Sequence, residues 1–132
     1  MDKRVQRFLE NNHGAIMTTL KKGGAPHVAR VGVGLVDGKL WSSGTQTRVR
    51  TRHLRRDPRG ALCVLDASNP YSWLGIESRI TILEGPEAPD LNLALYRAIA
   101  GEPDDVDEYK RAMVEEQRLI YEFSIERTYG QF

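Results

Sequence analysis

Arginine is the residue type whose spacing most clearly allows chemistry in this sequence. Six of the twelve residues from 48 to 59 are arginines. On a helical wheel at about 100° per residue, one stripe gathers Arg48, Arg52, Arg55 and Arg59. Arg50 falls on the opposite side, between Val49 and Leu54, which are the apolar residues available to face a core. The pattern therefore predicts that Arg50 is drawn partly beneath its helix.

A guanidinium that is partly removed from water needs an anion, because a buried unpaired charge is prohibitive. Arg50 falls in the first turn of the predicted helix, where free N–H groups and the helix dipole favour negative charge. With the hydroxyl of Thr51 beside it, Arg50 can form a phosphate site. A carboxylate of the protein, such as Glu77 or Glu84, is the alternative partner, and the spacing supports both interpretations about equally.

The outer arginines also have two interpretations: a solvated face paired with acidic residues, or a site for a long polyanionic ligand. The net charge is +1, but residues 1–83 carry 14 basic and 6 acidic residues, whereas residues 84–132 carry 5 and 12. Trp41, Tyr71 and Trp73 could add stacking surfaces for a nucleic acid. We expect no nucleic-acid partner, because the pI of 7.9 is low for such a domain and the basic charge is confined to one element.

No established catalytic motif is present: the sequence lacks a nucleophile elbow, a zinc-protease helix, a P-loop and a dinucleotide-binding glycine motif. His13, His27 and His53 do not have ligand spacing, so no metal site is predicted. Cys63 is the only cysteine, which excludes an intramolecular disulfide. The longest aliphatic stretch is about five residues, against roughly 20 for a membrane span, and no signal-peptide core begins the sequence. We therefore expect a cytoplasmic protein with no membrane partner.

The elements that must position the arginines are mostly strands. Alternation and turn signals predict strands over 15–20, 26–36, 39–43, 60–66, 71–84 (with a kink near Gly75) and 119–126. Helical periodicity predicts helices over 3–12, over about ten residues ending at Asp57, and after the caps Asp90 and Asp104–Asp105. We expect one domain, residues 1–132, of mainly β (α+β) class: a six-stranded antiparallel β-barrel with short peripheral helices. The acidic helical insertion at about 88–117 is expected to be a solvated cover.

The arginine segment from Arg48 to Arg59 resembles the pyridoxamine-5′-phosphate oxidase-like split β-barrel superfamily. It is most similar to the actinobacterial deazaflavin (coenzyme F420)-dependent reductases of that superfamily. Residues 15–28, 95–102, 109–113 and 125–130 are similar to the family's opening hairpin, inserted helices and closing strand. The resemblance covers nearly the whole chain in order, and it implies a homodimer of split barrels with two cofactors in clefts at the interface.

The resemblance also implies which residues bind the cofactor. Arg50 takes the place of the lysine that usually binds the phosphate, with Arg48, Val49 and Thr51 beside it. An arginine keeps the charge and adds a bidentate fork that suits phosphate. The ring system would lie along Ser42, Ser43 and Gly44, and Arg30 would reach the cofactor from the adjacent strand.

Two further groups of residues are implied by the same resemblance. Tyr71 and Trp73 would wall the pocket, from this protomer or from its partner. The poly-glutamyl tail of the deazaflavin would be held by the outer arginines Arg52, Arg55, Arg56 and Arg59. His53 stands where the family commonly has asparagine, and no role is carried onto it.

By this resemblance the protein is an oxidoreductase that transfers a hydride from reduced coenzyme F420 to a small unsaturated or quinone-like substrate. No catalytic side chain is assigned, because the cofactor supplies the hydride and the protein has only to place it. A proton would come from Tyr71 or from water. An FMN-dependent oxidoreductase of the same fold ranks second, because FMN lacks the acidic tail that suits the outer arginines. A non-catalytic carrier of F420 or haem is the third interpretation.

Overall fold

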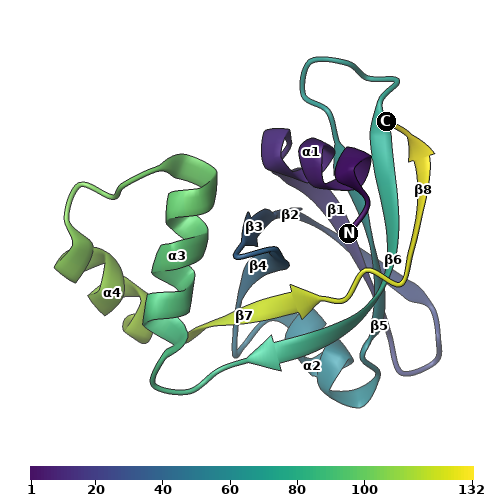
Figure 1. Cartoon of the computed structure of the whole chain (residues 1–132). Coiled ribbons are helices and arrows are strands. Elements are labelled where there is room, and N and C mark those ends of the chain that lie inside the picture. Colours follow the sequence, from purple (N-terminus) through teal and green to yellow (C-terminus); the bar gives the residue numbers. More distant parts are fainter.

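The computed structural model describes residues 1–132 as a curled antiparallel sheet with four helices around it (Figure 1). The strands are β1 (Gly14–Leu20), β2 (Pro26–Gly32), β3 (Gly34–Val36), β4 (Lys39–Thr45), β5 (Arg59–Leu65), β6 (Trp73–Leu83), β7 (Arg118–Phe123) and β8 (Arg127–Gln131). The helices are α1 (Lys3–Asn11), α2 (Val49–Arg56), α3 (Ala88–Ala100) and α4 (Val106–Glu115). The sheet order is β2-β1-β5-β6-β7-β4-β3, and β8 pairs with β6.

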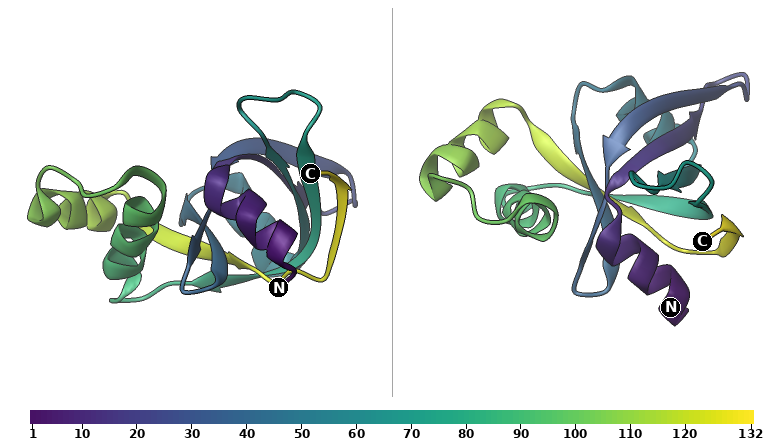
Figure 2. Two further views of the ribbon diagram at one scale, coloured as in Figure 1. Left: turned by 45° about the horizontal axis from the view of Figure 1, so that its top comes forward. Right: turned by 90° about the horizontal axis from the view of Figure 1, so that it is seen from above.

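The sheet curls around β6, which is shared between its two halves. The first part of β6 pairs with β5 from Trp73 to Arg79, and with β8 from Trp73 to Glu77. The last part pairs with β7, from Ile80 to Leu83. Because one strand serves both halves, the sheet bends into an open barrel, which Figure 2 shows from two further directions.

Helix α1 closes one side of the barrel core. Asp2 caps it, since its carboxylate accepts a hydrogen bond from the backbone N–H of Arg4 at 2.7 Å. Val5, Phe8 and Leu9 are its buried residues, and they join the largest apolar cluster of the molecule. The predicted amphipathic helix over 3–12 is thus confirmed, and its apolar face is the one that the periodicity indicates.

Helices α3 and α4 form a pair that stands out from the barrel beside β7 (Figure 1). Leu95 of α3 packs with Trp41 of β4 and Ile120 of β7 in a second apolar cluster. Gly34 allows α3 to pack closely against β3, because a Cβ at this position would lie only 2.9 Å from Cγ1 of Ile99 on α3. The helical pair is therefore docked on the barrel by side chains of its own.

The prediction of six strands is wrong, because the structure has eight. The predicted strand over 26–36 is divided at Val33 into β2 and β3. The N–H of Val33 donates to the carbonyl of His13, just before β1, at 2.8 Å. The alternation pattern does not predict β8, since its sequence has no apolar alternation and includes Gly130 at φ 125°, although the resemblance matches residues 125–130 to the family's closing strand. The mainly β class and the curled antiparallel sheet are confirmed.

Two local expectations are also corrected. Helix α3 begins at Ala88 with Glu87 as its N-cap, so Asp90 lies in the first turn and does not cap the helix. β6 runs through Gly75 in regular register, and no kink is needed there. Gly75 instead leaves room for the ring of Tyr129, which would lie 2.5 Å from a Cβ at this position. No helix of the structure combines the length and the apolar composition required to cross a membrane.

Candidate functional site

A cleft of 360 Å³ lies between the barrel and the helical pair. Polar and charged residues of its lining are Arg30, Ser43, Arg50, Asn92, Tyr96, Tyr109 and Arg118. Its aliphatic wall is formed by Val31, Leu95, Ile99 and Ala100, with Gly32 beside them. The lining thus contains three arginines and no carboxylate. Such a cleft suits a ligand that has an anionic group and an apolar body.

Arg50 is the residue of this cleft whose charge is least satisfied. Its Nε is buried and has no hydrogen-bond partner. Burial is the main cause that lowers the pKa of Arg50, and the neighbouring cations Arg48 and Arg118 lower it further. The guanidinium lies over the ring of Tyr121, 5.8 Å from the ring centroid. Because Arg50 lines the cleft and no carboxylate does, an anion bound there would supply the charge partner that Arg50 lacks.

The carboxylates considered as partners for Arg50 are engaged elsewhere. Glu84 forms an ion pair with Arg55 at 2.9 Å, and this contact holds the pKa of Glu84 at about 2. Glu77 pairs with Arg127 at 3.2 Å. The structure therefore gives no support to the interpretation in which a protein carboxylate neutralises Arg50.

The first turn of α2 is fixed to the barrel by buried hydroxyls. Thr51 is fully buried, and its hydroxyl donates to the carbonyl of Thr45 at 2.6 Å and lies 2.5 Å from the hydroxyl of Tyr121. The ring of Tyr121 occupies the space where a side chain at Gly44 would stand. The expectation that Thr51 adds a hydroxyl to a phosphate site is therefore corrected: Thr51 positions the helix and does not reach the cleft.

Strand alternation separates the three residues at the end of β4. Ser42 is fully buried and donates to the carbonyl of Gly32 at 2.6 Å. Gly44 is buried beneath Tyr121. Only Ser43 lines the cleft, where its hydroxyl donates to Oδ1 of Asn92 at 2.5 Å. Of these three positions, Ser43 alone presents its side chain to the cleft, because Ser42 and Gly44 face inward.

The remaining arginines of segment 48–59 lie outside the cleft, and Arg59, which the helical wheel placed on the helix, begins β5 instead. Arg48 and Val49 are exposed at the start of the helix, next to Arg50. Arg55 binds Glu84 and Gln46, Arg56 donates to the carbonyl of Leu20, and Arg59 pairs with Asp57 at 2.8 Å. Arg55, Arg56 and Arg59 thus have partners within the protein, whereas Arg48 and Arg52 are exposed to water without an ion pair.

The aromatic residues predicted to wall the pocket are also remote from the cleft of their own chain. Tyr71 is 79% exposed in the loop before β6. Trp73 packs edge-to-face on Tyr129, with ring centroids 5.9 Å apart. Neither residue lines the cleft, so these aromatics could contact a ligand there only from a second copy of the chain.

The helical pair contributes half of the cleft, and sequence patterns did not indicate this. Asn92, Leu95, Tyr96, Ile99 and Tyr109 come from α3 and α4, and Arg118 begins β7. The apolar stripe of α3 was visible in the sequence, but a stripe does not say whether it faces a core or a ligand. The expected solvated cover is in fact a wall of the candidate site.

The histidines lie away from the cleft. The Thr19 hydroxyl and Nδ1 of His53 are hydrogen-bonded at 2.9 Å, and the ring of His27 stands edge-on to His53 at 5.3 Å. His13 donates from Nδ1 to the carbonyl of Val33 at 3.0 Å. No three side chains of histidine, cysteine, aspartate or glutamate gather at metal-ligand spacing.

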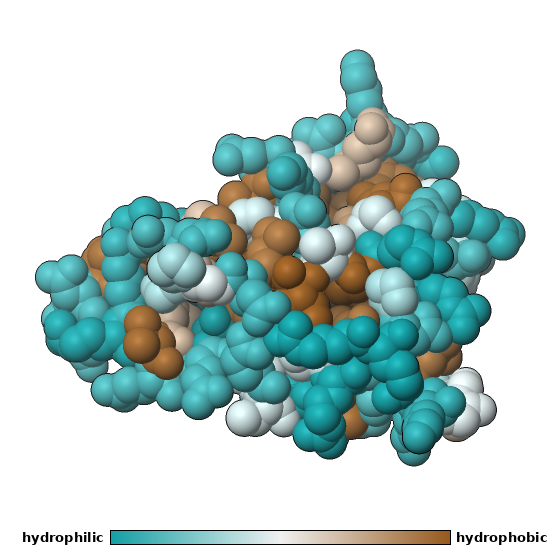
Figure 3. Space-filling model, turned by 90° about the horizontal axis from the view of Figure 1, so that it is seen from below, coloured by the Kyte–Doolittle hydropathy of each residue, from teal (hydrophilic) through white to brown (hydrophobic).

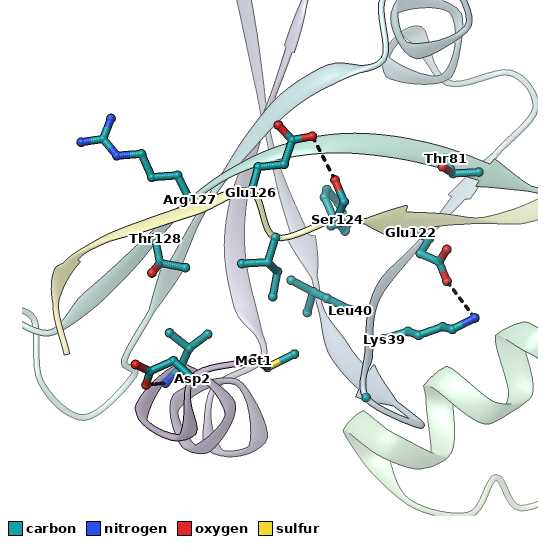
Figure 4. A pocket seen from close by; sticks show the side chains of 14 residues that line it. Met1, Asp2, Lys39, Leu40, Thr81, Glu122, Ser124, Glu126, Arg127 and Thr128 are labelled. Atoms are coloured by element: carbon teal, nitrogen blue, oxygen red, sulfur yellow. Dashed lines mark hydrogen bonds and ion pairs between the residues drawn. The ribbon is translucent and has the colours of Figure 1, made fainter.

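A larger cavity of 530 Å³ lies between the start of α1, the turn from β3 to β4 and the end of β7 (Figure 4). Its charged groups have partners: Lys39 pairs with Glu122 at 3.9 Å, and Nε1 of Trp41 donates to Glu122 at 2.9 Å. Arg50, which lies elsewhere, holds the one buried side-chain polar atom without a partner. The smaller cleft is for this reason the candidate functional site.

The hydrophobic surface of the molecule is not evenly spread. Figure 3 shows apolar residues gathered in a hollow between the protruding helices and the barrel, with hydrophilic residues around them. Apolar surface rimmed by polar residues is typical of binding sites and interfaces.

Comparisons with solved structures identify the fold. A conserved hypothetical protein of Mycobacterium tuberculosis superposes with a TM-score of 0.80 at 20% identity, over 97% of this chain and 82% of that one. An F420 reductase gives 0.76 at 21% identity over 96% of each chain. HutZ, the haem storage protein of Vibrio cholerae, gives 0.72 at 11% identity over 98% and 93%.

The family model described as pyridoxamine 5′-phosphate oxidase matches residues 1–132, which is the whole chain. The superfamily predicted from the arginine segment is therefore confirmed. This chain belongs to the pyridoxamine 5′-phosphate oxidase family.

Proposed function

We propose that the protein is an oxidoreductase that binds coenzyme F420 in the cleft between the barrel and the helical pair. It would pass a hydride to a small unsaturated or quinone-like substrate. The observation that carries the proposal is Arg50, whose buried Nε has no partner in a cleft without carboxylates. The fold shared with an F420 reductase supports the choice of cofactor class.

Different residues of the cleft would bind the phosphate and the ring of the cofactor. Arg50 would bind the phosphate with charge-assisted hydrogen bonds, and Tyr121 and Thr51 hold the helix that presents it. Leu95, Ile99 and other aliphatic residues of the wall would hold the planar ring and exclude water. The reduced cofactor supplies the hydride, so the chain needs no nucleophile of its own.

A homodimer is part of the proposal, and the outward face of the barrel sheet supports it. Ile16 and Cys63 lie side by side on β1 and β5, with side chains on the opposite face from the buried core residues, and the neighbouring Gly75 of β6 is covered on this face by the ring of Tyr129. Leu65 and Tyr129 extend this apolar face and are 38% and 42% exposed. Such a face is unusual on a monomer and suits a second copy.

The position of Arg30 links this face to the cleft. Arg30 pairs across β2 and β1 with Ile16, so it lies on the same outward side, and it also lines the cleft. A second copy seated on the face would therefore reach the cleft opening. This arrangement would allow the partner subunit to supply Tyr71 or Trp73 to the bound ring.

FMN is the second candidate cofactor, because it also joins a planar ring to a phosphate and would satisfy Arg50 equally. A haem carrier is favoured by the shared fold with HutZ. The cleft lining, however, contains no histidine, cysteine or methionine, and among the residue types that bind haem iron it offers only the tyrosines Tyr96 and Tyr109. The side chains thus fit a flavin-like ligand better than haem.

Two measurements on the purified protein test the proposal. Fluorescence titration with F420 and with FMN should give tighter binding of F420, and tighter binding of FMN would reverse the order of the two cofactors. Oxidation of reduced F420 with a panel of enones and quinones should exceed the protein-free rate. Binding without turnover on any acceptor would contradict the enzymatic function and favour a carrier.

A further inference from the structure

The start of α2 and the start of β7 meet at one end of the cleft. Thr45, the last residue of β4, is the register partner of Arg118, and the N–H of Gln46 donates to the carbonyl of Gln117 at 3.0 Å. The short segment after β4 leads directly to Arg48 and Arg50. Arg50 and Arg118, from two distant parts of the sequence, thereby line this end, and the exposed Arg48 stands beside Arg50 just outside it.

The three arginines have too little negative charge around them. Arg118 is bound by Glu116, with Nε to Oε1 at 2.8 Å, and its side chain is 26% exposed. Arg50 has no carboxylate partner. Burial is the main cause that lowers its pKa, and the nearby charges of Arg48 and Arg118 lower it further. One carboxylate thus faces three guanidinium groups. A ligand with a single negative charge would leave an excess of positive charge at this end.

The outer face of α2 does not offer a comparable site. Arg55 is bound to Glu84 and Gln46, and Arg59, the first residue of β5, is bound to Asp57. Arg52 forms no ion pair, but its side chain is exposed to water. An acidic group of a ligand would have to displace the carboxylates at Arg55 and Arg59, and it would meet Arg52 in open solvent, where an ion pair contributes little. At the cleft end it would meet the half-buried charge of Arg50 and Arg118, which the protein leaves unbalanced.

We propose that Arg118, together with Arg48, binds a second anionic group of the ligand, a carboxylate placed next to the phosphate that Arg50 holds. The inference rests on the proposed function and deepens it. The acidic tail of the cofactor would leave the cleft between the start of α2 and the start of β7. This route differs from the one that the resemblance implies, in which the outer arginines Arg52, Arg55, Arg56 and Arg59 hold the tail.

Glu116 provides a matched variant for Arg118. In the free protein Glu116 occupies part of the fork of Arg118. Removing the carboxylate frees the arginine, so Glu116→Gln should leave the affinity for F420 unchanged or raise it a few-fold. Arg118→Gln removes the proposed ligand contact and should lower that affinity about tenfold. A purely structural ion pair would make the two variants behave alike.

The experiment titrates each variant with F420, which has both a phosphate and carboxylates, and with FMN, which has the phosphate alone. Arg118→Gln should lower F420 affinity about tenfold and FMN affinity less than about threefold, and Arg118→Lys should restore most of the loss. Arg7→Gln on the exposed face of α1 controls for the change in net charge. Thermal unfolding of each free variant checks that it is folded.

Three outcomes would overturn the inference while F420 still binds the unchanged protein. Equal losses for F420 and FMN would place Arg118 at the phosphate or in a structural role. Equal losses for Arg118→Gln and Glu116→Gln would make the ion pair the cause. A larger F420 loss for Arg55→Gln than for Arg118→Gln would return the tail to the outer face. Failure of the unchanged protein to bind either cofactor would instead contradict the proposed function itself.

Discussion

The guanidinium of Arg50 lies 5.8 Å from the centre of the fully buried Tyr121 ring, and it has no carboxylate beside it. A cation over an aromatic face gains about 0.5–2 kcal/mol, which is attraction without neutralisation. Arg50 is therefore held in place while its charge remains available to a ligand. The same tyrosine reaches Thr51 through its hydroxyl, so one residue supports both the cation and the helix that carries it.

The hydrogen bond between Tyr121 and Thr51 predicts a measurable loss of stability on Tyr121→Phe. The lost bond contributes about 1 kcal/mol, and the ring beneath Arg50 stays in place. We expect urea unfolding to show about this loss, with cofactor affinity changed by less than about threefold. Tyr129→Phe, whose hydroxyl lies on an exposed residue, is the control and should change stability by under about 0.5 kcal/mol. Equal stability of the two variants would contradict the role given to the Tyr121 hydroxyl.

Asn92 allows a test of the anion site from the opposite wall. Asn92 is buried, accepts from Ser43 at 2.5 Å and donates to the carbonyl of Ala88 at 3.0 Å. Asn92→Asp keeps the acceptor and places a carboxylate in the cleft with Arg50. This internal anion should compete with the ligand phosphate and lower the affinity for F420 and FMN by more than about tenfold.

The control for Asn92→Asp is Asn92→Ala, which loses both side-chain hydrogen bonds and adds no charge. It should lower thermal stability and reduce affinity much less than the aspartate does. Isothermal titration with each cofactor measures both variants. If alanine and aspartate weaken binding equally, the cleft does not act as an anion site.

His53 predicts how stability changes with pH. Burial is the main cause that lowers its pKa, and the nearby cations His27, Arg56, Arg52 and Lys21 lower it further. The unfolded chain therefore takes up a proton near pH 6.5 before the folded protein does. Stability should be full above this pH and should fall as the pH drops below it towards the folded pKa.

His53→Asn tests this assignment, because an amide can still bond the Thr19 hydroxyl but does not titrate. Urea unfolding between pH 7.5 and about 5 should show a flatter pH dependence for the variant than for the unchanged protein. His13→Asn is the matched control, since His13 is only half-buried and lies elsewhere. An unaltered pH dependence in His53→Asn would assign the acid sensitivity to other groups.

The proposed dimer predicts that a charge on the outward sheet face dissociates the protein. Leu65→Arg replaces a residue of this face that is 38% exposed, so the fold of the protomer should tolerate it. Sedimentation should give a dimer for the unchanged protein and a monomer for the variant. Val114→Arg on α4 makes the same chemical change at a position that is 65% exposed and should leave the dimer intact. Dissociation by Val114→Arg alone, or a monomeric unchanged protein, would contradict the assigned interface.

The sequence predicts the parts of this fold that depend on local pattern. The periodicity of residues 3–12 indicates which face of α1 is buried, and the helical wheel separates Arg50 from the outer arginines. The sequence does not predict the direction of the hydroxyl side chains. Ser42 and Thr51 are predicted to contact the ligand, yet both face inward. The side of a strand or helix that meets the core depends on tertiary packing. Arg118 and Asn92 carry no local signal, since only the pairing of β4 with β7 and the docking of α3 bring them to Arg50.

The most direct test of the account is Arg50→Ala, measured both by cofactor titration and by thermal unfolding of the free protein. Losing a charge-assisted hydrogen-bonding group costs about 1.5–3 kcal/mol, so affinity for the phosphate-bearing cofactor should fall about ten- to hundredfold. The free protein should nearly keep its melting temperature, because Arg50 has no carboxylate partner and the substitution loses only its contact over the Tyr121 ring. Unchanged affinity together with a lower melting temperature would contradict the central claim that Arg50 serves a ligand.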